Sequence, residues 1–304
     1  MWGMLIVVRV LTAYILFPIT LKKTLERIKN LPTPRKVVLI IWQFLLCLSF
    51  SIALAIVAKI TGFGRLDWQF NYLWAVVAIL GVFNAYACYC QWRAMDTNLS
   101  KTAIGTQLDD AIAIALGYFF LGEKKFFGFQ LVAGIALCFA AGFILIGFKA
   151  GEENSANRRL AKNVLKYSVI WGVAGAAQRF FNLEGLPIFN FLVCWYGGSA
   201  IGALLIHLFG KIVKKEKVSF WLDEEDKKKL PAVAFFVWVS LVLGYLIANH
   251  VRISIYQPIF LVSEAVLMAF IGLYYFHEKK EMKTREWAAI AIGLAGVMIV
   301  GTSY

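Results

Sequence analysis

Two stretches of sequence decide the fold: IGTQLDDAIAIALGYFFLGEKK at 104–125 and IFLVSEAVLMAFIGLYYFHEKK at 259–280. They lie 155 residues apart, and each is a long apolar run that closes on Glu-Lys-Lys. Each also carries an acidic residue at the same place inside the run, Asp109 in the first and Glu264 in the second. Repetition at this scale in an apolar chain indicates a duplicated bundle of membrane helices.

Weaker pairs extend the repeat toward the start of each copy. With small slips in offset, the pairs are Trp2 with Trp171, Pro18 with Pro187, Tyr86 with Tyr245, and Arg93 with Arg252. Because the offsets differ from pair to pair, the copies have diverged and do not form a tandem array. The sequence therefore predicts a first repeat over 1–150, a charged linker over 151–163 and a second repeat over 164–304.

The composition is that of a membrane protein. The chain is 61% hydrophobic and 16% charged, with a mean hydropathy of +0.71. A spanning helix needs about 20 mostly apolar residues, and such stretches run at 2–20, 37–58, 70–92, 104–122, 127–148, 164–182, 189–210, 231–249, 257–276 and 286–302. They are continuous, not alternating, so they predict helices and not barrel strands. We expect an all-α, polytopic protein of the cell membrane, with ten transmembrane helices in two inverted five-helix repeats.

The net charge of +13 comes from basic residues that lie mainly in loops. Most Lys and Arg residues fall in the loops after odd-numbered helices, at 21–36, 149–166, 211–230 and 277–285. Since basic loops stay in the cytoplasm, this bias places these four loops inside and both termini outside. The same distribution argues against a nucleic-acid partner.

Acidic residues inside apolar runs mark the candidate site. Ionisable groups at membrane depth cost a few kcal/mol each on insertion scales, so they face a cavity or one another. Glu264 could line a substrate or proton pathway, with a structural ion pair as the alternative. Asp109, beside Asp110, could share that role or instead cap a helix that begins near Thr106. Facing a cavity, these carboxylates could bind a proton or a cationic substrate.

Four arginines also lie in or near the apolar runs: Arg9, Arg93, Arg179 and Arg252. Arg179 or Arg252 is the expected charge partner of Glu264. Arg93 and Arg252 stand near helix ends, where a long side chain could extend to the interface instead.

Aromatic residues make up 15% of the chain, and four of them occupy matched spans of the two halves. They are Trp42 and Trp195, and Tyr86 and Tyr245. They could line a cavity and stack on a substrate, or they could fill the core between helices.

Other motifs point to structure. Glu123 and Glu278 are expected at turns between helices, and Gly198 and Gly202 at a close helix contact. The cysteines form no CxxC pair and the three histidines are scattered. We therefore expect no metal, cofactor or disulfide framework.

With these residues in view, the chain resembles the drug/metabolite transporter superfamily of the EamA type. The clearest match runs from Arg93 through Leu121-Gly122-Glu123-Lys124 to Gln130, Gly134 and Gly142. The second half departs from the pattern, with His277 in place of the glycine and Glu286-Trp287 where Gln is usual. The resemblance implies an inverted-repeat carrier with a central cavity that works by alternating access.

We therefore expect a secondary transporter, not an enzyme, that moves an amino acid, an amine or a sugar derivative. Coupling to a proton or ion gradient is expected, since no Walker-type segment is present. The expected partners are a small-molecule substrate and the lipid bilayer, with the chain as monomer or homodimer. The alternatives are a membrane-embedded enzyme, a flippase for a lipid carrier and a channel.

Overall fold

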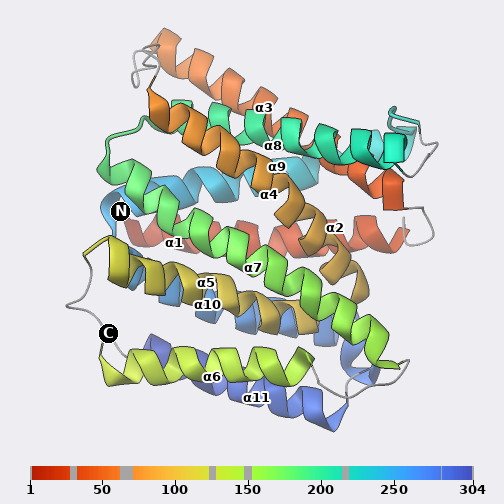
Figure 1. Ribbon diagram of the computed structural model, residues 1–304, viewed down its shortest axis with the longest axis vertical. Helices are drawn as coiled ribbons and strands as arrows, with labels where there is room; N and C mark the ends of the chain where they lie inside the picture. The colour runs from red at the N-terminus through yellow and green to blue at the C-terminus, as the bar shows by residue number, and fades with distance from the viewer. Residues whose placement is uncertain are drawn as a thin grey trace.

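The computed structural model describes residues 2–27, 33–61, 71–122, 128–146, 153–213, 219–281 and 283–302. The elements in these ranges are all helical, which confirms the predicted all-α class (Figure 1). In the first half they are α1 (Trp2–Leu11), η1 (Thr12–Leu16), α2 (Phe17–Arg27), α3 (Thr33–Thr61), α4 (Tyr72–Thr97), α5 (Leu99–Phe120) and α6 (Phe129–Ile146). In the second half they are α7 (Glu153–Leu183), α8 (Ile188–Val213), α9 (Glu224–His250), α10 (Ile253–Phe270), η3 (Ile271–Tyr275), η4 (Glu278–Glu281) and α11 (Thr284–Gly301).

Among the described residues, six helical segments are long and apolar enough to cross a membrane. They are Trp2–Glu26, Arg35–Thr61, Tyr72–Thr97, Ile188–Ile212, Glu224–His250 and Ile253–Tyr275. Shorter apolar stretches lie in α6 and α11, at Phe129–Ala141 and Trp287–Val300. The chain thus has the helices of a multi-pass membrane protein.

The helices run back and forth across the molecule (Figure 1). α1 starts and α11 ends at the left of that view, and α3, α7, α9 and α11 start at the right. α4 packs on α8, α3 on α8 and α9, α5 on α7 and α10, and α6 on α11.

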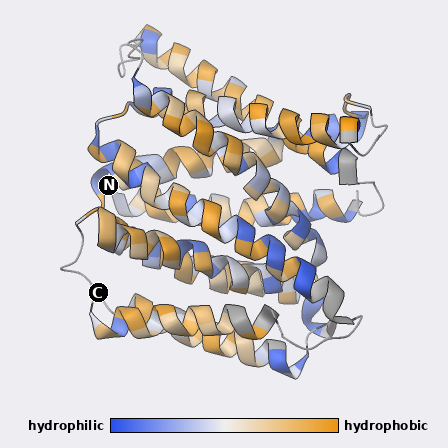
Figure 2. Cartoon of the chain, in the orientation of Figure 1, coloured by the Kyte–Doolittle hydropathy of each residue, from blue (hydrophilic) through white to orange (hydrophobic). Residues whose placement is uncertain are grey.

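Large apolar side chains cover the outward faces of several helices. The exposed ones include Ile52, Ile56 and Ile60 on α3, Val76, Ile79 and Phe83 on α4, and Ile201, Leu205, Leu208 and Ile212 on α8. Figure 2 shows hydrophobic residues along the helix bodies and hydrophilic ones near the helix ends, many of them at the lower right. Soluble monomers rarely expose contiguous apolar surface of this extent, so lipid is the natural solvent for these faces.

Two helix starts differ from the sequence predictions. α5 begins at Leu99, not at 104, because Asn98 both closes α4 and opens α5. Its backbone N–H donates to Ala94 O at 3.0 Å, and its side chain accepts from Lys101 N at 2.8 Å. The alternative that Asp109 caps a helix beginning near Thr106 is therefore wrong, since both residues lie in the middle of α5. The expected linker at 151–163 is helical from Glu153 onward, as the start of α7.

The predicted glycine contact is confirmed at the interface of α4 and α8. A Cβ added to Gly202 would stand 2.6 Å from Val82 O, and one added to Gly198 would stand 2.8 Å from the carbonyl carbon of Ala78. The two helix backbones therefore touch, as small residues allow in a membrane.

Glu278 has a larger role than the turn position expected for it. Its carboxylate is buried and accepts hydrogen bonds from Leu99 N and Ser100 N, both at 2.8 Å, and from Ser100 Oγ at 2.7 Å. Lys22 Nζ lies 3.3 Å from the same carboxylate and donates to Met95 O at 2.8 Å. Glu278 thus caps the N-terminus of α5 from the far end of the chain. Glu123, its partner in the repeat, lies outside the described residues.

Candidate functional site

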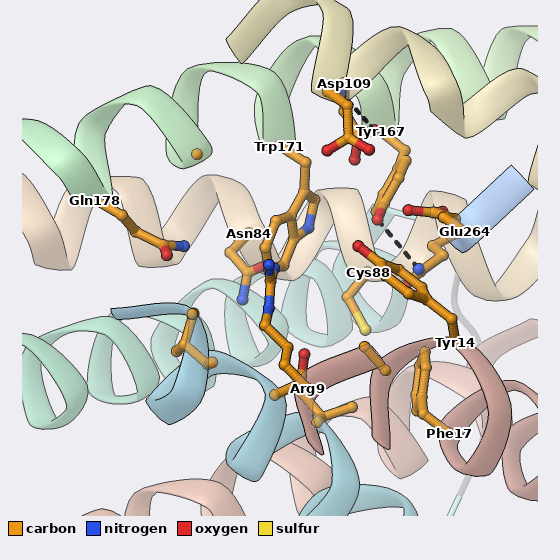
Figure 3. Close-up of a pocket in the computed structure, with 18 of the residues that line it drawn as sticks. Arg9, Tyr14, Phe17, Asn84, Cys88, Asp109, Tyr167, Trp171, Gln178 and Glu264 are labelled. Carbon is orange, nitrogen blue, oxygen red and sulfur yellow. Dashed lines mark hydrogen bonds between the residues drawn. The ribbon is translucent and has the colours of Figure 1, made fainter. Parts of the chain in front are cut away.

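A cavity lies between the two halves of the chain, with an empty volume of about 1080 Å³ that includes its open part. Helices of both halves line it. The first half contributes residues that include Arg9, Tyr14, Asn84, Asp109 and Asp110, and the second half residues that include Tyr167, Trp171, Gln178, Trp195 and Glu264. Figure 3 shows how most of these side chains project into the space.

Three carboxylates meet at the cavity wall. Asp109 and Asp110 come from the middle of α5 and Glu264 from the middle of α10, two helices that pack on each other. One ligand atom from each of the three lies within 4.8 Å of the others, and all three residues are buried. The sequence repeat paired Asp109 with Glu264, and the fold brings them together.

Neighbouring side chains fix two of the carboxylates. Thr106 Oγ1 donates to Glu264 Oε1 at 2.6 Å, and Gln257 Nε2 donates to Asp110 Oδ1. Asp110 Oδ2 is buried without a hydrogen-bond partner in the described part of the chain. A buried carboxylate oxygen without a donor is costly, so this wall of the cavity is suited to a proton or a cation.

Among the described residues that line the cavity, Arg9 is the cation, whereas Arg179 or Arg252 was expected beside Glu264. Arg9 lies on α1, and its guanidinium carbon stands 3.6 Å from the centroid of the Phe260 ring. Figure 3 shows the side chain extending into the cavity. A lone arginine in an N-terminal apolar run carries little signal by itself. Its place depends on how α1 packs against α9 and α10.

The other predicted arginines lie elsewhere. Arg179 donates to Ala248 O at 2.5 Å, where α7 meets α9. Arg252 is exposed and directly precedes α10, about 18 Å from Glu264 at 1.5 Å of rise per residue. The expectation that either residue is the charge partner of Glu264 is therefore wrong. Arg93 contacts a residue of its own helix, α4, and its Nη1 atom donates to the Tyr89 hydroxyl at 3.2 Å.

Of the four predicted aromatic residues, Trp195 lines the cavity. It packs on Trp171, with ring centroids 6.0 Å apart. Trp42 instead donates from Nε1 to Phe220 O at 2.9 Å, beside the start of α9.

The two predicted tyrosines are outside the cavity lining as well. The Tyr86 hydroxyl accepts from Lys166 Nζ at 2.8 Å. The Tyr245 hydroxyl donates to Leu186 O at 2.6 Å, and its ring stacks on Phe191 at 4.3 Å. For Trp42, Tyr86 and Tyr245 the packing alternative therefore holds.

The three carboxylates are also the one group in the described residues with a spacing that could hold a metal ion. Carboxylate oxygens suit hard cations such as Mg²⁺ and Ca²⁺. The five cysteines are free thiols, and all but Cys194 are buried.

Comparison with known proteins defines the fold and no more. The sequence matches no protein-family profile and no curated protein. A solved structure described only as the crystal structure of a protein is similar to this chain, with a TM-score of 0.64 and 18% sequence identity. The match covers 98% of this chain and 96% of that chain. At this identity the similarity shows a shared fold across the whole chain.

Proposed function

We propose that the chain is a secondary transporter that moves a small polar metabolite across the cell membrane by alternating access. The observation that carries the proposal is the central cavity, which is polar and charged inside an apolar helical bundle. Charged groups are expensive at membrane depth and mark substrate or ion pathways. Here three carboxylates and an arginine face one space between the two halves.

The arrangement of the helices supports ten membrane helices in two inverted halves. In the repeat, α3 corresponds to α8 and α4 to α9, so exchange of the halves carries the α4–α8 contact onto the α3–α9 contact. α5 packs on its counterpart α10, and α6 on its counterpart α11. Five crossings per half invert the second copy, as in many carriers with a substrate site at the repeat interface. The motif around Gly122, Gln130 and Gly134 favours the drug/metabolite transporter superfamily, EamA type, as its relative.

Coupling to protons through the carboxylates is part of the proposal. In proteoliposomes with an imposed pH gradient, a screen of amino acids, amines and nucleotide sugars should find a solute that the protein accumulates above empty vesicles. Glu264→Gln should abolish gradient-driven uptake, because Gln keeps the size and accepts from Thr106 but cannot exchange a proton. Asp109→Asn should weaken uptake less, since Asp110 and Glu264 remain.

Glu184→Gln is the matched control, because Glu184 is exposed at the turn between α7 and α8. It should transport as the unmodified chain does. Full gradient-driven uptake by Glu264→Gln would remove the coupling role of that residue. Absence of uptake of every solute by the folded, unmodified chain would contradict transport itself.

A further inference from the structure

The cavity carries two charged ends of opposite sign that do not pair with each other. Among the described residues, Arg9 forms no ion pair within 4.0 Å with any of the three carboxylates. Opposite charges in a space of low dielectric attract strongly. Charges that face the same cavity without touching leave room for a ligand that contacts both.

The Arg9 end lacks an acceptor. Its Nε and Nη1 atoms are buried and have no hydrogen-bond partner in the described part of the chain. The guanidinium of Arg9 stacks on the ring of Phe260, and this contact fixes the direction in which its N–H groups point. Planar guanidinium groups bind carboxylates through two parallel hydrogen bonds, so an anionic group of a ligand is the partner that this end lacks.

The carboxylate end lacks a donor. Asp110 Oδ2 is buried and unpartnered, and oxygens of Asp109 and Glu264 lie within 4.8 Å of it. A second acceptor is independent of this cluster: Gln43 is 1% exposed, lines the same cavity, and its Oε1 has no hydrogen-bond partner in the described residues. An ammonium group offers three N–H donors, which suits the several acceptor oxygens of the three carboxylates.

Aromatic rings line the space as well, including Tyr14, Phe17, Trp171 and Trp195. Such rings pack on a carbon skeleton and attract an organic cation over their faces. A bare metal ion would use the carboxylates but neither the rings nor Arg9. A nucleotide sugar would bring phosphate charges toward three carboxylates, and a neutral sugar would leave both charged ends unmatched.

We infer that the cavity binds a zwitterionic amine of amino-acid size, with its anionic group on Arg9 and its ammonium among Asp109, Asp110 and Glu264. The inference rests on the proposed function, because it names the substrate class of the same cavity. One ammonium does not neutralise three carboxylates, so negative charge remains for the coupling proton of the transport cycle.

The test is ligand binding to the purified, detergent-solubilised chain, read by thermal shift and titration. The probes are the twenty protein amino acids with 4-aminobutanoate and 6-aminohexanoate, and then the decarboxylated amine and the deaminated acid of each hit. At least one zwitterion should bind, and loss of either charge should weaken binding about tenfold or more, as expected when a charge-assisted hydrogen bond is lost.

Arg9→Gln should weaken the zwitterion about tenfold or more and leave its decarboxylated amine within about twofold. Arg9→Lys keeps the charge and should recover part of the affinity, which guards against a variant that fails to fold. Arg159→Gln, at an exposed site on α7, is the matched control and should bind as the unmodified chain does.

Two outcomes would overturn the inference: no zwitterion of the panel binds, or Arg9→Gln weakens the amine as much as the zwitterion. Uptake of a sugar or nucleotide sugar by proteoliposomes, without zwitterion binding, would keep the transporter and remove this substrate class. Zwitterion binding without transport of any solute would support the binding site and contradict the proposed function.

Discussion

At the scale of single residues, His277 has an unusual backbone angle that it shares with its counterpart in the predicted repeat. Among the described residues His277 is the one non-glycine residue with a positive φ, 56°. Its counterpart at the offset of 155 residues is Gly122, with a φ of 71°. Both follow the end of a helix, where a left-handed residue closes the last turn and glycine is preferred. His277 therefore has the backbone conformation of the glycine at the matching position of the first predicted repeat.

His277→Gly should therefore stabilise the protein by about 1 kcal/mol, because glycine has no Cβ to oppose the left-handed conformation. The measurement is the melting temperature of the purified chain in detergent, which should rise by a few degrees. His250→Gly is the control, since His250 ends α9 in helical conformation and glycine there should lower the melting temperature. A lower melting temperature for His277→Gly would show that contacts of the His277 side chain stabilise the protein by more than its left-handed backbone conformation destabilises it.

At the scale of helices, hydropathy predicted the apolar cores well and the polar ends poorly. The start of α5 was predicted too late because Ser100, Lys101 and Thr102 lower the hydropathy of its first turns. These turns are stabilised by caps, and one cap comes from Glu278, whose distance along the chain hides it from local pattern analysis. The pairing of Asp109 with Glu264 was visible as a repeat. The place of Arg9 was not, because it depends on packing against Phe260.

The contact between α4 and α8 gives a prediction at this scale. Gly198→Ala should destabilise the protein by about 1–3 kcal/mol, because the new methyl group would overlap the Ala78 carbonyl and force the helices apart. Gly197→Ala is a control one residue away, since nothing lies within 4 Å of a Cβ there. It should leave the melting temperature equal or higher, because alanine favours helix. Equal losses for both variants would contradict close packing at Gly198.

The buried pair of Lys22 and Glu278 joins α2 to the start of α5. Glu278→Ala should cost about 3–5 kcal/mol in the free energy of unfolding, since it leaves a buried ammonium and the first N–H groups of α5 without their acceptor. Chemical denaturation in detergent measures the loss. Glu26→Ala, at an exposed site on α2, should change stability by less than about 0.5 kcal/mol.

A double variant, Lys22→Met with Glu278→Ala, tests whether the two residues act together. Its loss should be smaller than the sum of the two single losses, because the second change removes the group that the first left unpaired. Additive losses would mean that the two side chains contribute separately.

At the scale of the whole molecule, the basic loops predict a direction in the membrane. The helix ends that flank these loops, including the end of α2 and the starts of α7, α9 and α11, lie together at the right of Figure 1. The turn between α7 and α8 joins helices at the opposite end. Since positive loops are retained in the cytoplasm, we expect Ser219, just before α9, to face inside and Glu184, in the turn after α7, to face outside.

Single cysteines at these two positions test the direction in intact cells with a membrane-impermeant thiol reagent. Both positions are exposed, whereas four of the five native cysteines are buried, so the unmodified chain is a suitable blank. Glu184→Cys should be labelled in intact cells, and Ser219→Cys should be labelled only after permeabilisation. The reverse pattern would place the basic end outside, against the charge rule. It would also mean that the end of the bundle with Ser219 faces outside and the end with Glu184 faces the cytoplasm.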